Sequence, residues 1–179
     1  TLPLIIGMDK PGLIEYANGK IDDIGIWNRA LSRQEITNLY TNNLNPSSTT
    51  QCWSEIATGL RHSGAIKPDG TLWTWGGDFY GELGNGSDSN YLNSPSQVGT
   101  ASNWSKITCA TYNTYAIKSD GTLWAWGSNS DGQLGDGTYN NSNIPIQVGT
   151  DNHWKSVSAW QNYAMGLKTD GTIWSWGNN

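Results

Sequence analysis

The segment KSDGTLWAWG at residues 118–127 recurs in nearly the same form at two other places in the chain. One copy, KPDGTLWTWG, spans residues 67–76, and the other, KTDGTIWSWG, spans residues 168–177. An Asp-Gly pair between two apolar runs is a strong signal for a β-hairpin with a two-residue turn, in which both central residues take positive φ. The sequence therefore predicts three β-hairpins with turns of this kind.

The copies are spaced at a regular period of about 50 residues, which indicates one supersecondary unit repeated along the chain. The units open with Trp53, Trp104 and Trp154, and the first two close with a Pro-x-Gln-Val-Gly-Thr run at residues 95–100 and 145–150. Four β segments in about 50 residues match one blade of a β-propeller. A unit this small must stack on its neighbours to bury its apolar face.

This pattern resembles the repeat of the regulator of chromosome condensation family over residues 52–179. The resemblance implies an all-β fold: about two and a half blades of a seven-bladed propeller, with four or more blades following Asn179. It also implies that His62, in the Gly-x-x-His run at residues 59–62, packs or hydrogen-bonds near the propeller axis. The second and third units have other residues at the positions that correspond to this run, ATYN at 110–113 and WQNY at 160–163.

Residues 18–42 read NGKIDDIGIWNRALSRQEITNLYTN and resemble the C-terminal end of laminin-G-like, concanavalin-A-like jelly-roll domains. We therefore expect residues 1–44 to be the end of a jelly roll and residues 45–51 to be a linker. One short helix is expected after Ser32, which forms a capping box with Glu35. Asp22 and Asp23 supply only two carboxylates where a hard cation takes six to eight oxygens, so a solvated or capping role is expected.

The composition excludes some functions. Charged residues make up 14% of the 179 residues and the net charge is −5, which argues against a nucleic-acid surface. No apolar run reaches the roughly 18–20 residues that cross a bilayer. Because the chain stops within a repeat, we expect both ends to be cut from a longer protein, and targeting segments to be missing with them. We also expect residues 1–179 to be unstable alone, since an incomplete ring leaves a strand edge open.

No catalytic, metal-binding or cofactor-binding pattern stands out, so we expect no enzyme activity and no cofactor. The two histidines, His62 and His153, lie at different phases of the repeat with no nucleophile motif beside them. Glu82 occupies the position that Gln133 has in the next unit, which indicates that Glu82 is a turn residue rather than an acid catalyst. Cys52 and Cys109 do not fit a zinc site, and either a disulfide between blades or two buried thiols remains open.

Two surface features are candidates for binding. The pairs Trp73/Trp75, Trp124/Trp126 and Trp174/Trp176 each place two indoles on one side of a blade, where packing between blades is favoured over ligand stacking. The resemblance places the variable residues Arg61, Tyr112, Trp160 and Gln161 on loops at one face of the disc. Variable, aromatic-rich loops on a rigid ring make a natural partner surface, and secreted bacterial β-lactamase inhibitors with this fold bind in that manner.

A jelly roll fused to this propeller type resembles large extracellular bacterial surface proteins such as those of Bacteroidetes. The leading hypothesis is a non-catalytic adhesion or scaffold module that binds protein or glycan through the propeller-face loops. A second hypothesis is a pair of accessory modules of a secreted enzyme whose catalytic domain lies elsewhere. A third, nucleotide exchange or chromatin binding as in the founding family member, conflicts with the acidic charge balance and the jelly-roll fusion.

Overall fold

The computed structural model describes residues 52–87 and 90–178. The expected jelly-roll end at residues 1–44, with its short helix, and the linker at residues 45–51 lie outside the described residues. None of the described residues forms a helix long and apolar enough to cross a membrane.

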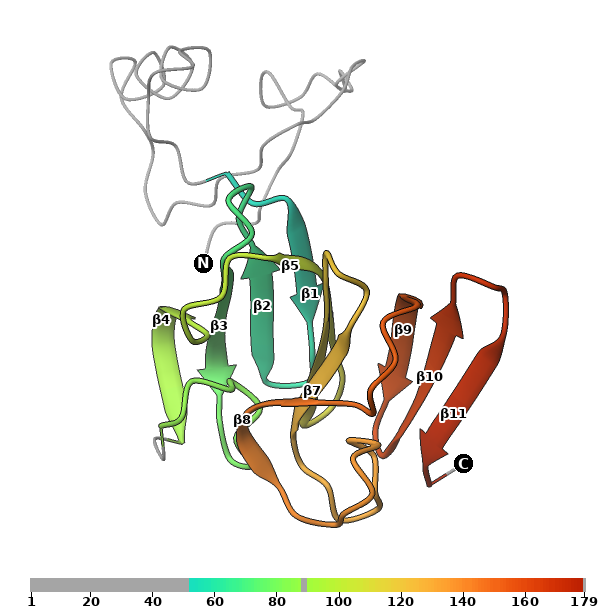
Figure 1. Ribbon diagram of the computed structural model, residues 1–179. Coiled ribbons are helices and arrows are strands. Elements are labelled where there is room, and N and C mark those ends of the chain that lie inside the picture. The colour runs from blue at the N-terminus through green and yellow to red at the C-terminus, as the bar shows by residue number, and fades with distance from the viewer. Residues whose placement is uncertain (1–51, 88–89, 179) are drawn as a thin grey trace, which may run out of the picture. The chain divides into compact units, whose positions relative to one another are not determined.

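Within the described residues, eleven strands form three antiparallel sheets, ordered β1-β2-β3-β4, β5-β6-β7-β8 and β11-β10-β9 (Figure 1). The strands are β1 (Glu55–Thr58), β2 (His62–Ile66), β3 (Leu72–Gly77), β4 (Tyr91–Gln97), β5 (Trp104–Cys109), β6 (Asn113–Lys118), β7 (Leu123–Gly127), β8 (Ser142–Gln147), β9 (Trp154–Trp160), β10 (Tyr163–Lys168) and β11 (Ile173–Gly177). Each sheet corresponds to one sequence repeat, and we call the three sheets blades 1, 2 and 3 in chain order.

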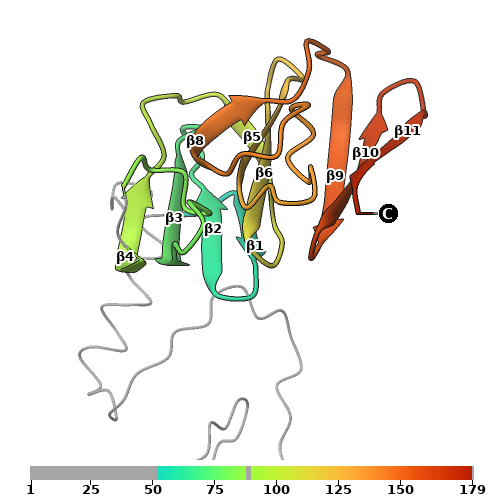
Figure 2. The ribbon, with the colours of Figure 1, turned by 90° about the horizontal axis from the view of Figure 1, so that it is seen from below.

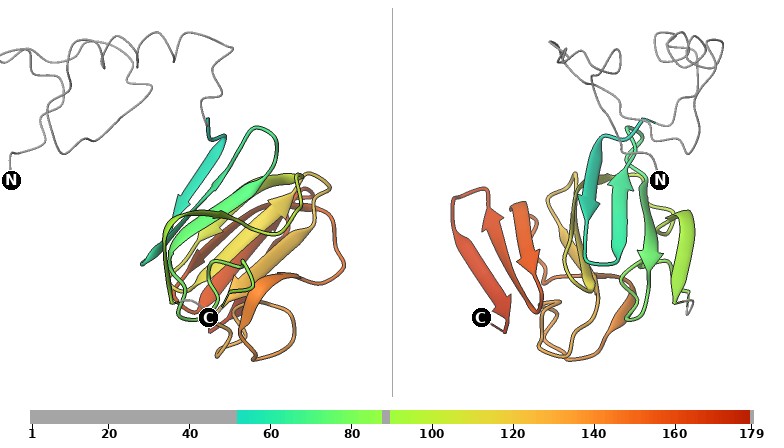
Figure 3. Two further views of the ribbon diagram at one scale, coloured as in Figure 1. Left: turned by 90° about the vertical axis from the view of Figure 1, so that its left-hand side faces the viewer. Right: turned by 180° about the vertical axis from the view of Figure 1, so that it is seen from behind.

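The three blades stand side by side, with blade 2 between the other two (Figure 2). The first strands of successive blades are in contact, β1 with β5 and β5 with β9. In the left view of Figure 3, the strands of the three blades have similar tilts. The outer strands β4 and β8 contain Pro95 and Pro145, and proline suits an edge strand because it has no N–H to donate. The described residues thus form part of a β-propeller, as the repeat predicted.

The Asp-Gly turns join paired strands as expected, but they are not two-residue turns. In the first copy, Lys67 N donates to Thr71 O at 2.9 Å and Gly70 N donates to Lys67 O at 2.9 Å. Gly70 has a φ of 78°, whereas Asp69 does not have a positive φ. The loop is therefore a three-residue turn that ends in a left-handed glycine. The Asp69 carboxylate explains the difference, because it accepts hydrogen bonds from the N–H and hydroxyl of Thr71 and so holds the turn.

The core lies between blades. Ile66, Leu72 and Val98 of blade 1 pack with Trp104 and Trp126 of blade 2. A second cluster joins blades 2 and 3 in the same manner, and its members include Tyr115, Leu134, Val148, Trp154 and Ala164. Each blade therefore buries its apolar face only because a neighbour covers it.

An indole from each later blade is inserted into a loop of the blade before it. Trp126 Nε1 donates to the Glu82 carbonyl at 2.9 Å, and Trp176 Nε1 donates to the Gln133 carbonyl at 2.8 Å. The Trp126 ring lies so close to Gly84 that a Cβ there would be 2.4 Å from Nε1. The tryptophans of the β7 pair lie on one side of the blade, since both rings are 6.1 Å from the Trp104 ring. Packing between blades is thus the role of Trp126.

The first tryptophan of each pair has a lysine ammonium group over its ring. Lys118 Nζ lies 3.9 Å from the Trp124 ring centroid and 4.9 Å from that of Trp104. Lys67 and Lys168 make the same pair of contacts in blades 1 and 3. This cation–π arrangement places the ammonium group against two indoles at one end of every blade.

The two cysteines are not joined. Both are free, Cys52 exposed and Cys109 buried. Burial raises the pKa of the Cys109 thiol to about 12, so this thiol is an unreactive core group. The expectation of a buried thiol is correct for Cys109 and wrong for Cys52.

Candidate functional site

The loops of interest gather at the end of the blades opposite the Asp-Gly turns. His62 pairs with Gly76, Asn113 pairs with Gly127 and Tyr163 pairs with Gly177. The β1–β2, β5–β6 and β9–β10 turns therefore lie at the same end as the long connections that leave β3 and β7. We call this end the loop face.

Two pairs of side chains lie on the loop face, and we call them together the aromatic patch: Arg61 with Phe79, and Tyr80 with Tyr112. The Arg61 guanidinium carbon lies 5.7 Å from the Phe79 ring centroid. The Tyr80 and Tyr112 ring centroids are 4.9 Å apart with an interplanar angle of 59°. Phe79 is 50% exposed and Tyr80 is 43% exposed, so the patch presents large aromatic surface to solvent.

Short hydrogen bonds hold the loop that carries Phe79 and Tyr80. Gly77 N donates to Arg61 O at 2.7 Å, which ties this loop to the β1–β2 turn. The Asp78 carboxylate accepts from Leu83 N at 2.9 Å, and the Glu82 carboxylate accepts from Tyr80 N at 2.7 Å. The two buried carboxylates thus hold the loop from inside while the two rings project outward.

Burial raises the pKa of Glu82, and the Asp78 carboxylate beside it acts in the same direction. Trp126 and Thr114 of blade 2 both donate to the Glu82 carbonyl. Glu82 is therefore a turn residue buried between two blades, in agreement with the interpretation from sequence.

His62 belongs to the same buried network. Its Nε2 lies 2.9 Å from Thr114 Oγ1, which in turn donates to the Glu82 carbonyl at 2.8 Å. Burial lowers the pKa of His62 to about 4, so the ring is neutral near pH 7. The hydrogen-bonding role expected for His62 is confirmed, and the histidine links blade 1 to blade 2 beneath the patch.

Hydrogen bonds also link the turns of neighbouring blades. Leu60 N donates to Ala110 O at 3.3 Å, and Gln161 N donates to Thr111 Oγ1 at 3.2 Å. Asn162 Nδ2 donates to Asp131 Oδ2 at 2.9 Å. The loop face is therefore a connected surface across all three blades.

The residues predicted from the sequence fall into two groups. Arg61 and Tyr112 lie in the aromatic patch. Gln161 lies in the β9–β10 turn with a φ of 43°, and its backbone bonds to blade 2. Trp160 ends β9 opposite Tyr163 and is 58% exposed. The structure thus places Arg61 against Phe79 and Tyr112 against Tyr80, two adjacent residues of one loop, and places Gln161 and Trp160 at the blade 3 turn.

Sequence reasoning missed Phe79 and Tyr80. A comparison of repeats contains the signal, because residues 78–81 read DFYG where residues 129–132 read NSDG. Only the first unit places two aromatic residues at this phase, and Phe79 is the only phenylalanine of the chain.

The aromatic patch offers recognition groups. Within residues 52–87 and 90–178, no group of three His, Cys, Asp or Glu side chains is placed to hold a metal ion. The patch consists of one guanidinium, two phenols and one phenyl ring, which can stack, donate hydrogen bonds and exclude water. This chemistry serves binding.

Comparison with known proteins identifies the repeat. The family model described as "Regulator of chromosome condensation (RCC1) repeat" matches residues 69–117 and 120–167. A second model with the same description matches residues 104–133.

Curated relatives share short segments with the chain. Human E3 ubiquitin-protein ligase HERC2 is 37% identical over 92 residues, which are 50% of this chain and 2% of that protein. The X-linked retinitis pigmentosa GTPase regulator homolog of Caenorhabditis elegans is 37% identical over 88 residues, 48% of this chain and 6% of that protein. The chain thus matches only a small part of each relative.

Solved structures share the fold. Prp20p from Saccharomyces cerevisiae superposes with a TM-score of 0.63 at 21% identity, covering 70% of this chain and 33% of that one. Human WBSCR16 gives a TM-score of 0.63 at 23% identity, covering 72% and 33%. Together with the repeats matched over more than half of the sequence, this shows that the chain belongs to the family of regulator of chromosome condensation (RCC1) repeat proteins.

Proposed function

We propose that this chain is a non-catalytic binding module of a large extracellular bacterial surface protein, and that it holds a protein partner through the aromatic patch. The observation that carries the proposal is the exposed cluster of Arg61, Phe79, Tyr80 and Tyr112 on hydrogen-bonded loops. Tyrosine and arginine are enriched among residues that dominate the binding energy of protein interfaces. Rigid loops also lower the entropy that binding costs.

Two further observations support a protein partner. Prp20p, which has this fold, binds Gsp1p and histones and has been solved with Kap60 bound, so a protein with this fold can hold protein partners. The patch also combines the loop after β3 of blade 1 with the β5–β6 turn of blade 2, so its surface extends over two blades.

The extracellular setting is supported by sequence alone. The chain has few charged residues, and residues 18–42 resemble the end of laminin-G-like domains. An adhesive or scaffolding role follows from a binding surface without reactive groups. The alternative is that the same surface docks accessory modules to a catalytic domain elsewhere in a secreted enzyme.

The test uses the full-length protein and cell-envelope extract from its own organism. The F79A/Y80A variant is compared with Y91A/Y139A, since Tyr91 and Tyr139 are 59% and 74% exposed and lie outside the patch. We expect F79A/Y80A to weaken binding at least tenfold, about 1.4 kcal/mol, and the control to match wild type.

Two treatments of the extract identify the partner class. Protease digestion should abolish binding, and periodate oxidation of glycans should leave it unchanged. Equal binding by the two double variants, or loss of binding only after periodate, would reject the proposal.

A further inference from the structure

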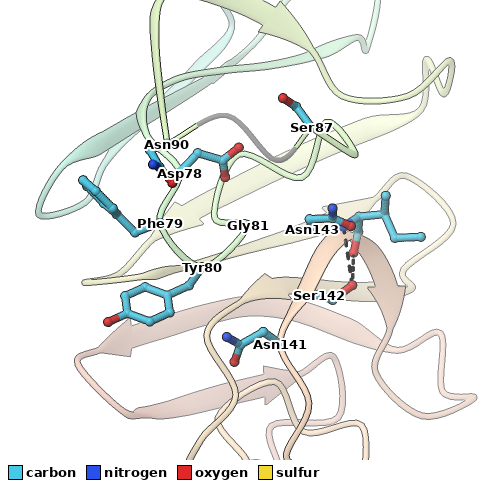
Figure 4. Close-up of a pocket in the computed structure, with 10 residues that line it drawn as sticks. Asp78, Phe79, Tyr80, Gly81, Ser87, Asn90, Asn141, Ser142 and Asn143 are labelled. Atoms are coloured by element: carbon cyan, nitrogen blue, oxygen red, sulfur yellow. Dashed lines mark hydrogen bonds between the residues drawn. The ribbon is translucent and has the colours of Figure 1, made fainter.

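A polar hollow lies beside the aromatic patch, between the 78–87 loop of blade 1 and the first residues of β8 in blade 2 (Figure 4). Its volume is about 640 Å³, within the range of about 300–1,000 Å³ usual for small-molecule sites. The lining residues are Asp78, Phe79, Tyr80, Gly81, Ser87, Asn90, Asn141, Ser142, Asn143 and Ile144.

The two walls of the hollow are fixed relative to each other. Gly86 N of blade 1 donates to Asn143 O of blade 2 at 2.8 Å. Gly81 has a φ of 85°, and a Cβ on it would lie 2.5 Å from the Asn143 Cα atom. Only glycine therefore permits this close approach, and the hollow is preformed.

The polar lining is dominated by groups that both donate and accept hydrogen bonds. Asn90, Asn141 and Asn143 contribute amides, and Ser87 and Ser142 contribute hydroxyls. Within the protein, Asn141 Oδ1 already accepts from Asn129 N at 2.8 Å and Ser142 Oγ donates to Ile144 O at 2.7 Å, which leaves the Asn90 amide and the Asn141 Nδ2 group as the principal ligand contacts. The side chains of Asn90 and Asn141 are exposed, so a ligand can reach them. In Figure 4, Asn90, Asp78 and Ser87 lie on one side of the hollow and Asn143 and Ser142 on the other.

Charge disfavours anionic ligands. Among the lining residues that the structure describes there is no lysine, arginine or histidine, and the one acidic group is the Asp78 carboxylate. No cation of this lining would therefore attract a phosphate, sulfate or carboxylate. The lining includes few apolar side chains, namely Ile144, Phe79 and Tyr80, which argues against a lipid ligand.

We infer that this hollow binds a neutral oligosaccharide. Sugar hydroxyls both donate and accept, so they match the side-chain amides and hydroxyls of the lining. Phe79 and Tyr80 lie at one edge of the hollow with their rings directed away from Asn143 and Ser142, so they can contact the C–H surface of a sugar that extends past this edge. The site is additional to the protein-binding role, although it shares these two rings with the aromatic patch.

The test measures binding of neutral glucan, xylan, mannan and chitin oligosaccharides to the full-length protein by isothermal titration calorimetry. The N90A variant removes an amide from the hollow, and N140A is its matched control, because Asn140 is exposed and does not line the hollow. We expect saturable binding of at least one oligosaccharide, weakened about fivefold to tenfold in N90A and unchanged in N140A.

A second pair of measurements separates this site from the protein-binding patch. R61A should weaken binding of the protein partner and leave the oligosaccharide affinity unchanged, because Arg61 does not line the hollow. A heparin-derived sulfated oligosaccharide should bind more weakly than the neutral one. The inference is overturned by any of three results: no saturable binding, preference for the sulfated oligosaccharide, or equal affinities of N90A and N140A.

Discussion

The contact between Trp126 and Gly84 can be tested with a matched pair of glycine substitutions. Gly84 and Gly99 both have left-handed backbones, with φ of 65° and 59°. An alanine Cβ at position 84 would lie 2.4 Å from Trp126 Nε1, whereas at position 99 it would meet nothing within 4 Å. Both substitutions therefore cost about 1–2 kcal/mol for the left-handed alanine, and only G84A adds a clash.

The surroundings of Trp126 determine how much free energy that clash costs. The indole is fully buried and donates to the Glu82 carbonyl at 2.9 Å, so it must move within a packed interface. Overpacking costs about 1–3 kcal/mol, and loss of the hydrogen bond about 1 kcal/mol more. We expect urea unfolding of the full-length protein, followed by tryptophan fluorescence, to show a total loss of roughly 3–6 kcal/mol for G84A and about 1–2 kcal/mol for G99A. Equal losses would refute the indole contact between blades.

Further predictions concern buried and half-buried charges. The pKa of His62 is about 4 in the folded protein against 6.5 in the unfolded chain, so folding is penalised once the ring becomes protonated. The free energy of unfolding should therefore decrease by up to about 3 kcal/mol as the pH drops from above 6.5 to 4. The H62N variant should lose this pH dependence. Burial raises the pKa of Glu82, which disfavours its charged form, so E82Q should raise the free energy of unfolding at pH 7; a decrease in chemical denaturation would contradict this. K118M should cost about 1 kcal/mol by loss of its contacts with Trp104 and Trp124, whereas K155M, at an exposed position, should change thermal stability little.

The repeat made the architecture of the propeller predictable. A unit with one hairpin and four β segments recurs at a regular period, and each unit forms one sheet whose strands are neighbours in the order of the sequence. Residues two apart on a strand share a face, so the sequence alone predicts that Trp124 and Trp126 lie on one side of the blade, as both contacts with Trp104 confirm. A periodic pattern indicates which face of a strand is buried, and in this fold the buried faces are those that pack against the neighbouring blade.

The turn type and the binding cluster were harder to predict. The choice between a two-residue and a three-residue turn depends on side-chain hydrogen bonds such as those that Thr71 donates to the Asp69 carboxylate, which strand periodicity does not report. The aromatic patch arises because a loop after β3 lies against the β5–β6 turn of the next blade, bringing Tyr80 to Tyr112. Such contacts depend on the angle between blades, and no local sequence pattern encodes that angle.

The most direct test of the proposed binding surface is site-specific photo-crosslinking. A benzophenone side chain replaces Phe79 in the patch or, as a control, Tyr139, which is 74% exposed and outside it. The account predicts one discrete protein adduct from position 79 and none from position 139. Excess wild-type protein should compete this adduct away, and excess F79A/Y80A protein should not. Adducts of equal yield from both positions, or an adduct that F79A/Y80A displaces as well as wild type does, would contradict the account.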